Sequence, residues 1–248
     1  MNLVMNHVAV FCIIVSVGIT EASESVARVT RVEGKASLMR TAWEEWRELR
    51  PNTPLRVGDQ VYTREESFVE LRYTGGEILR MNENSKITIR HADGTATKNY
   101  NGVGQIWVNM KKVASKGNEF EVSSPTAVAA IRGTVFKMDT REDSSTDVSV
   151  YDGKVEVGPS DELKKKQEEE KQKKQSPPPG GVTEVPGPEE VPGPYEVPLE
   201  TWRMIVSGQM ISVRSDGTFA QEQFDVAASA EDAFVKKNME LDAQIEEQ

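Results

Sequence analysis

Short runs in which apolar and polar side chains alternate constrain the fold of this chain more than any other feature. Val69, Leu71 and Tyr73 alternate with Glu70 and Arg72. Successive side chains of a β-strand point to opposite faces, so this period of two predicts a strand with one buried face. The same alternation recurs at residues 87–89, 106–110, 120–122, 136–138, 148–150 and 155–157.

Turn signals separate these runs at short intervals. They are Gly34, Gly58-Asp59, Gly75-Gly76, Asp93-Gly94, Gly102, Gly117, Gly133 and Gly153. Asp152-Gly153 lies between two valine-rich runs and predicts a hairpin over residues 148–157, with both turn residues at positive φ. Short strands with such punctuation are typical of a sandwich, a barrel or a compact β-solenoid. We therefore expect one β-domain over residues 25–159, in which Thr41–Leu49 is compatible with either a helix or a strand and loop.

The first 23 residues are interpreted as a signal peptide. Val8–Ile19 is a run of 12 mostly apolar residues, whereas a helix needs about 20 to cross a bilayer. That length suits the apolar part of a signal peptide, and Ala22-Ser23 offers a small-residue cleavage site. The alternatives are an uncleaved buried strand or a short anchor. We expect a periplasmic or secreted protein that is not an integral membrane protein.

Composition changes abruptly after the β-domain. Asp161–Gln175 is almost entirely Glu, Lys and Gln, which predicts either a solvated helix or disorder. Ser176–Pro198 holds eight of the 12 prolines and repeats Glu-Val-Pro-Gly-Pro, which favours an extended spacer. The alternative for this stretch is a docking site for a partner. Residues 160–199 are therefore predicted to be a linker.

Structure is expected to resume in residues 200–248. Trp202–Val206 and Met210–Val213 have the composition of strands, and Ser229–Glu247 has that of a helix with Ser229 as its N-cap. About 50 residues are marginal as an independent domain. We expect this piece to pack on the β-domain or on a partner.

The residues required by familiar catalytic routes are absent. Beyond the signal peptide there is one histidine, His91, and the only cysteine, Cys12, lies within the signal peptide. This excludes zinc sites with several His or Cys ligands, and a Ser–His–Asp triad would need His91. The net charge of −10 argues against nucleic-acid binding. A pair of glycosidase carboxylates is the enzymatic alternative that composition leaves open. We predict no enzyme activity, no catalytic residue, no metal and no cofactor.

Four segments, in order, resemble the FecR-domain family. Residues 119–136 read Glu-Phe-Glu-Val-Ser-Ser-Pro-Thr-Ala-Val-Ala-Ala-Ile-Arg-Gly-Thr-Val-Phe, similar to the family's aromatic-x-Val-x-Thr/Ser-Pro, small residues and Arg-Gly-Thr-x-Phe. Residues 55–63 hold its Gly-Asp step, residues 67–80 its strand–Gly–strand segment, and residues 146–157 its closing hairpin. The resemblance implies an all-β, compact sandwich or solenoid-like FecR domain, followed here by the Pro-rich linker and a small C-terminal β-plus-helix appendage.

The motif residues are expected to be structural. Pro125 would end a strand, Gly133 would take a conformation or a contact that forbids a Cβ, and Phe136 would point inward. Arg132 would bond several carbonyls across a turn; alternatively, it would hold a carboxylate of a ligand or partner. The full set is Gly58, Asp59, Phe120, Pro125, Arg132, Gly133, Thr134, Phe136 and Gly153.

The resemblance leaves the function open between three hypotheses. Well-known family members relay a signal from an outer-membrane iron transporter to a cytoplasmic sigma factor, through a cytoplasmic region and a transmembrane helix. About seven residues precede the apolar run here, so sigma-factor regulation is not carried over. The first hypothesis is a non-enzymatic periplasmic or surface scaffold that engages an envelope protein partner. The alternatives are a module for cell-wall glycan or peptidoglycan, and a signal-relay component related to FecR-type sensing.

Three tryptophans are the candidate surface for a glycan, because flat apolar rings stack on sugars. They are Trp43, Trp46 and Trp107. Core packing is the alternative role of Trp43 and Trp46. Trp107 is out of phase with Ile106 and Val108, so we expect it to be the more exposed.

Overall fold

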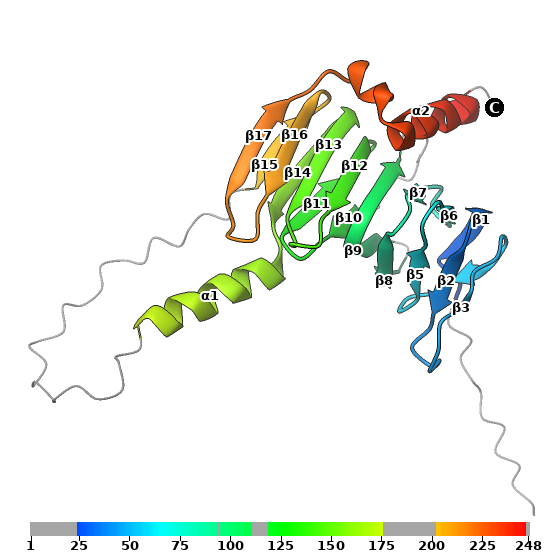
Figure 1. Cartoon of the computed structure of the whole chain (residues 1–248), viewed down its shortest axis with the longest axis horizontal. Helices are drawn as coiled ribbons and strands as arrows, with labels where there is room; N and C mark the ends of the chain where they lie inside the picture. The colour runs from blue at the N-terminus through cyan, green and yellow to red at the C-terminus, as the bar shows by residue number, and fades with distance from the viewer. Residues whose placement is uncertain (1–23, 94, 111–118, 176–201, 247–248) are drawn as a thin grey trace, which may run out of the picture.

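The structure is a computed structural model that describes residues 24–93, 95–110, 119–175 and 202–246. The predicted signal peptide and Pro-rich stretch lie outside these described residues. The described residues form 17 strands and two α-helices, which confirms the all-β prediction with a small helical part. The strands form two sheets, here called sheet A and sheet B, that share β9 (Figure 1).

Sheet A is antiparallel throughout. Its order is β4 (Pro54–Leu55), β1 (Ala27–Glu33), β6 (Phe68–Tyr73), β7 (Ile78–Met81), the second half of β9 (Ala96–Asn109), β12 (Val135–Thr140), β13 (Thr146–Asp152), β16 (Gln209–Val213) and β17 (Phe219–Gln223).

Sheet B has one parallel pair, β9 with β10. Its order is β3 (Arg47–Glu48), β2 (Ala36–Met39), β5 (Gln60–Thr63), β8 (Lys86–Ala92), the first half of β9, β10 (Glu119–Ser123), β11 (Ala127–Ile131), β14 (Lys154–Pro159) and β15 (Arg203–Val206).

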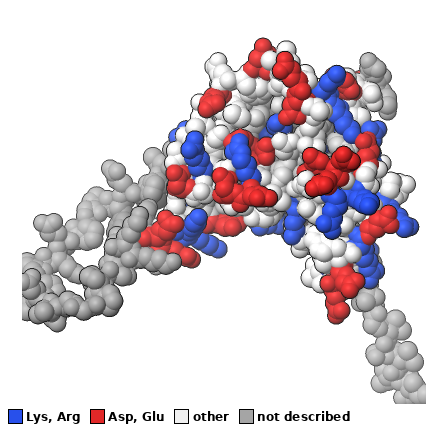
Figure 2. All heavy atoms as spheres, viewed as in Figure 1, with Lys and Arg blue, Asp and Glu red and all other residues white. Residues whose placement is uncertain are grey.

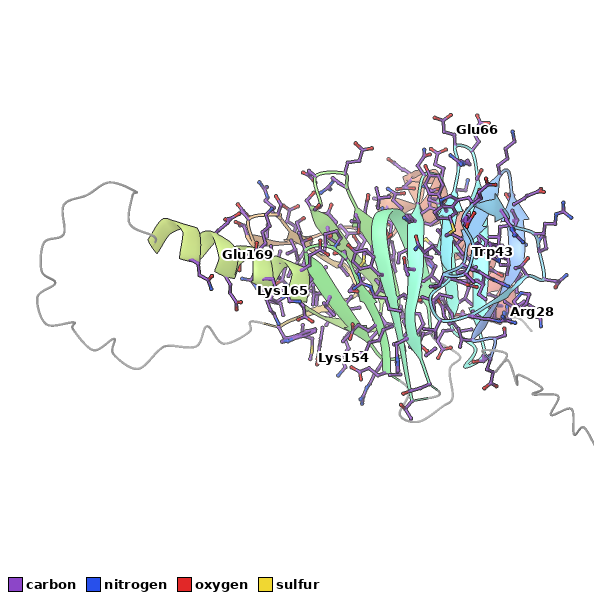
Figure 3. All side chains as sticks on the ribbon, turned by 90° about the horizontal axis from the view of Figure 1, so that it is seen from below. Arg28, Trp43, Glu66, Lys154, Lys165 and Glu169 are labelled. Carbon is purple, nitrogen blue, oxygen red and sulfur yellow. The ribbon has the colours of Figure 1, made fainter. Side chains whose placement is uncertain are left out.

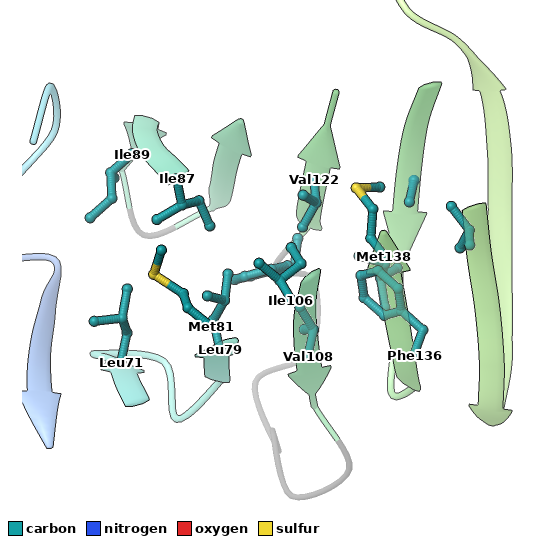
Figure 4. Packing of buried hydrophobic residues seen from close by; sticks show 14 of the residues in the cluster. Leu71, Leu79, Met81, Ile87, Ile89, Ile106, Val108, Val122, Phe136 and Met138 are labelled. Carbon is teal, nitrogen blue, oxygen red and sulfur yellow. The ribbon is translucent and has the colours of Figure 1, made fainter. Parts of the chain in front are cut away.

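The core lies between the two sheets. Leu71, Leu79 and Phe136 of sheet A meet Ile87 and Val122 of sheet B, and all five are fully buried (Figure 4). All but Leu79 are inward members of the alternating runs, so the period of two places those four correctly. Burying one such side chain contributes about 1.5–3 kcal/mol, and this shared core holds the sheets face to face.

The chain builds the sandwich by sending pairs of strands to alternate sheets. β10 and β11 pair in sheet B, β12 and β13 in sheet A, and β14 and β15 in sheet B again. The hairpin predicted over residues 148–157 is therefore wrong, because β13 and β14 lie in different sheets. Gly153 is the corner between them, at φ +84°, and Asp152 is not at positive φ. A Cβ on Gly153 would lie 2.9 Å from the carbonyl oxygen of Gly133 at the preceding corner.

The C-terminal piece packs on the β-domain. β15 extends sheet B, and β16 and β17 extend sheet A, so the strands continue both sheets. A 3-10 turn (Ala228–Glu231) then leads into α2 (Ala233–Glu246). The N-cap of α2 is Asp232 and not the predicted Ser229, since Asp232 Oδ1 accepts the backbone N–H of Phe234 at 2.8 Å and of Val235 at 3.2 Å.

Two stretches left open by the sequence take definite forms. The charged stretch after β14 is helix α1 (Asp161–Gln175), which projects away from the sheets with Lys165 and Glu169 on its surface (Figures 1 and 3). Leu163 is its one fully buried apolar side chain among those described. Thr41–Leu49 is a loop that contains the short strand β3, not a helix. No helix among the described residues is long and apolar enough to span a membrane.

Candidate binding face

The outer face of sheet A is covered by helix α2. Phe234 and Val235 of α2 pack on Phe68, Trp107 and Tyr151, which point outward from sheet A. The rings of Phe68 and Phe234 meet edge to face at a centroid distance of 6.3 Å. The chain therefore closes this face with its own C-terminal helix.

A buried charge network also holds α2 on sheet A. Arg80, fully buried on β7, donates from Nε to Glu70 Oε2 at 2.7 Å and from Nη1 to Asp242 Oδ1 at 2.5 Å. Trp107 Nε1 donates to Asp242 Oδ2 at 2.9 Å. Burial disfavours the charged form of Glu70, yet the hydrogen bonds from Thr30 and Arg80 outweigh it and lower its pKa. One carboxylate of α2 thus binds two side chains of the sheet.

Trp107 is not the exposed platform that the sequence predicts. It points away from the core, as its phase requires, but α2 lies over it and leaves 1% of its surface exposed. Alternation shows on which side of a strand a residue lies and not what covers that side. Trp107 therefore belongs to the contact with α2.

Buried and partly exposed residues alternate along the middle strands of sheet B: along β5, along β11, and along β8 as far as Arg90. Among the described residues, the outward side chains of these strands are therefore partly exposed. In β6 and β7 of sheet A, by contrast, nearly every residue is buried. We call the outward side chains of β5, β8, β9, β10, β11 and β14, together with Trp46 and Arg132 beside them, the open face.

One half of the open face carries aromatic rings with cations held over them. Lys86 Nζ lies 5.5 Å from the ring centroid of Trp46, and the ring of Trp46 meets that of Tyr62 at 6.3 Å. The guanidinium of Arg90 lies 3.6 Å from the ring centroid of Tyr100. Arg90 is the extra residue of a bulge between β8 and β9, and such a bulge re-aims the side chain it carries.

The tryptophans do not form a sugar-stacking platform together. Trp43 is half-buried against the core, with the guanidinium groups of Arg40 and Arg47 at 4.9 and 4.2 Å from its ring centroid. Trp46 is 38% exposed and joins the aromatic row described above. Trp107 is buried on the other sheet. Only Trp46 therefore lies on the open face.

Most FecR-like motif residues make contacts within the fold. Gly58 takes φ +90°, and Asp59, which follows it, accepts the backbone N–H of Arg56 at 3.0 Å. Burial raises the pKa of Asp59, against the lowering effect of that hydrogen bond and of Arg40. Phe120 is fully buried, edge to face with Tyr73, and Phe136 is fully buried in the core.

The remaining motif residues lie at corners of the sandwich, and all but Arg132 are explained by that position. The carbonyl of Pro125 accepts the Ser160 hydroxyl at 2.5 Å. Gly133 is at φ +62°, and a Cβ added there would have no atom within 4 Å, so backbone conformation and not crowding selects glycine. Thr134 Oγ1, fully buried, donates to the Lys154 carbonyl at 2.8 Å. The exception is Arg132, whose side chain is exposed.

Arg132 lies at a hollow on the open face. The predicted bonds to carbonyls across a turn have no counterpart among the described residues. Ile131, which precedes Arg132, pairs with Phe120 and Val155, and Glu119 and Lys154 are the next residues along those two strands. The half-buried Ala130 is smaller than the charged side chains around it, which leaves a hollow of about 370 Å³. It is lined by Glu119, Ala130, Ile131, Arg132, Lys154 and Glu156.

The sequence did not predict the half of the open face in which cations lie over aromatic rings. Tyr62 and Tyr100 occupy outward positions of their strands, and Tyr100 Oη donates to Glu162 of α1 at 3.1 Å. Their alternation with buried residues was the available signal, but the pairing of β5, β8 and β9 brings them into one row. Lys98 and Glu121 form an ion pair at 3.2 Å beside that row. On the side of the molecule that Figure 2 shows, acidic and basic side chains are interspersed.

The described residues show no metal centre. They contain no group of three or more His, Cys, Asp or Glu placed to hold a metal ion. His91 lies at an exposed turn, with Nε2 3.0 Å from Asp93 Oδ2.

Comparison with known proteins identifies the domain. No curated protein matches this sequence. Two crystal structures of a candidate anti-sigma factor from Parabacteroides distasonis ATCC 8503 are similar at 14% identity and a TM-score of 0.47; the match covers 67% of this chain and 60% of that one. Residues 59–156 match the family described as FecR protein. That stretch holds every motif residue from Asp59 to Gly153, and it is therefore a FecR domain.

Proposed function

We propose that this chain is a non-enzymatic, FecR-type regulatory protein of the cell envelope that binds a protein partner on its open face. The observation that carries the proposal is the difference between the two outer faces. In the described part of the chain, α2 covers the middle of the outer face of sheet A, whereas the outward side chains of sheet B stay partly exposed. Exposed cations, aromatic rings and the motif residue Arg132 lie on the open face.

The chemistry of the open face favours a protein as the partner. Tyr, Trp and Arg are enriched where proteins recognise one another, and here Trp46, Tyr62, Tyr100, Arg90 and Arg132 share one surface. The aromatic rings are already contacted by cations, so stacking on a sugar would have to displace them. Export to the periplasm or cell surface follows from the predicted signal peptide and is part of the proposal.

Site-specific photo-crosslinking in intact cells of the source organism tests this function. A photoreactive amino acid replaces Thr88, at the centre of the open face, or Gln221, an exposed residue of β17. We expect one protein to be captured from Thr88 and not from Gln221. Equal capture from both positions, or none from Thr88, would contradict the proposal.

A second experiment distinguishes a protein partner from a glycan partner. Cell-wall glycan isolated from the same cells is incubated with the purified chain and with its Trp46→Ala variant. We expect no retention of either. If the glycan retains the wild-type chain but not the Trp46→Ala variant, the partner is a glycan and not a protein.

A further inference from the structure

The four strands at the edges of the sheets differ in how they are protected. Unpaired backbone groups at a sheet edge are a template for another strand, and proteins usually blunt them with short strands, proline or charge. β4 has two residues and begins with Pro54, β3 is the charged pair Arg47–Glu48, and β17 ends in Gln-Glu-Gln. β15 is also short, with four residues, but it holds no proline and its outward side chains are apolar.

β15 presents a row of exposed apolar side chains at its edge. Trp202, just before β15, is 42% exposed, and Met204 and Val206 are 52% and 44% exposed. They alternate with inward residues, so all three point to the same side as the open face. Exposed large apolar residues are few in the described part of the chain, and the others, Trp46 and Val57, lie far from β15 in sequence.

The backbone of β15 has free groups on its outer side. Ser207 N–H donates to the Gly153 carbonyl, which fixes the odd-numbered residues as those that bond to β14. The even-numbered ones point the other way, and Val206 N–H accordingly donates to the side chain of Gln209 at 3.1 Å. The N–H and C=O of Met204 point to the same open side, with no partner among the described residues.

The edge is continuous with the open face. Val206 lies opposite Lys154, and Met204 lies opposite Glu156, both of which line the Arg132 hollow. Trp202 lies against Gly158, where a Cβ would come within 2.8 Å of the indole ring. A strand added to β15 would continue sheet B and place alternate side chains next to Met204 and Val206, on the same side of the sheet as this hollow.

We propose that the edge of β15 receives an extended strand of the partner protein, with apolar side chains at alternate positions. The inference rests on the proposed function and states how the partner attaches. A second copy of this chain fits less well, because β15 has four residues and a stable interface needs about 800 Å² from each side. A longer partner strand gains additional contact from the open face.

The test measures binding of a synthetic probe to the full chain. The probe is an octapeptide that alternates valine and threonine, and its control has the same sequence with alternate backbone amides N-methylated. Met204→Pro removes one outward N–H and is compatible with an edge strand. We expect at least 10-fold weaker binding of the probe by Met204→Pro, and about 2-fold tighter binding by Gln209→Ala, which uncovers the N–H of Val206.

Three results would overturn the inference. They are equal binding of the N-methylated control, unchanged binding by a Met204→Pro variant with wild-type thermal unfolding, and no binding of the probe at all. If the chain dimerises and Met204→Pro abolishes the dimer, the edge of β15 binds a second copy of this chain. The peptide assay uses no cellular partner, so its failure leaves the Thr88 crosslinking result standing, and the reverse also holds.

Discussion

The two outer faces of this sandwich are built by the same alternation and end in opposite states. On sheet A the outward residues Glu70, Arg80 and Trp107 are buried beneath α2. On sheet B the outward residues Tyr62 and Tyr100 stay partly exposed. The difference comes from a helix far along the chain, so local sequence sets the direction of a side chain and distant sequence sets its exposure.

The largest effect should come from removing the ring that α2 covers. Trp107→Ala should lower the free energy of unfolding by about 3–5 kcal/mol, because it leaves a cavity and removes the donor to Asp242. Trp46→Ala on the open face is the matched control and should cost about 1 kcal/mol or less. Urea unfolding of both variants measures the difference. Equal losses would mean that the two faces are not distinguished as the structure shows.

The next largest effect should come from the carboxylate on α2. Asp242→Ala should cost about 3 kcal/mol, because Arg80 stays buried with one carboxylate in place of two. Glu240→Ala, on the exposed side of α2, is the control and should change stability by less than about 0.5 kcal/mol. Thermal unfolding checks both. A loss below about 1 kcal/mol for Asp242→Ala would show that apolar packing alone holds the helix.

A corner substitution tests how the two sheets are joined. Gly153→Ala should cost about 2–3 kcal/mol, from positive φ and from the clash with the Gly133 carbonyl oxygen. Gly76→Ala has a φ of +99° but no atom within 4 Å of the new Cβ, so it should cost about 1 kcal/mol. Chemical denaturation compares them. Equal losses of unfolding free energy in the two variants would show that the clash with the Gly133 carbonyl oxygen contributes nothing.

Local sequence predicts the direction of a side chain better than it predicts the exposure of that side chain. Alternation places Leu71 and Phe136 in the core, because a strand has only two sides. It misplaces Trp107, because the helix that covers this ring lies more than 100 residues away. A hairpin turn and a corner both need a residue at positive φ, so Gly153 fits either, and only strand pairing tells them apart. The motif singles out Arg132, yet nothing local shows that its side chain is exposed.

Acid should weaken the closed face through Glu70. Its pKa is lowered on folding, so the ionised form stabilises the native state. That contribution is present above the ordinary carboxyl value near 4.5 and is lost as the pH falls through the lower native value. The unfolding free energy of the wild type should therefore exceed that of Glu70→Gln at pH 7, with a gap that narrows below about pH 4. A gap that is constant from pH 7 to pH 3 would contradict the proposed role of the ionised carboxylate.

The smallest effect on stability should come from Arg132, and this makes it the sharpest probe of the open face. Its exposed guanidinium has no partner among the described residues, so Arg132→Gln should change the free energy of unfolding by less than about 0.5 kcal/mol. The same substitution should reduce partner capture from the Thr88 photo-crosslinker, because a charge that no described residue pairs with can act on a partner. Arg214→Gln, an exposed arginine beyond β16, should leave both stability and capture unchanged. If Arg132→Gln instead unfolds the domain, the guanidinium serves the fold, and the open face must bind through its aromatic half alone.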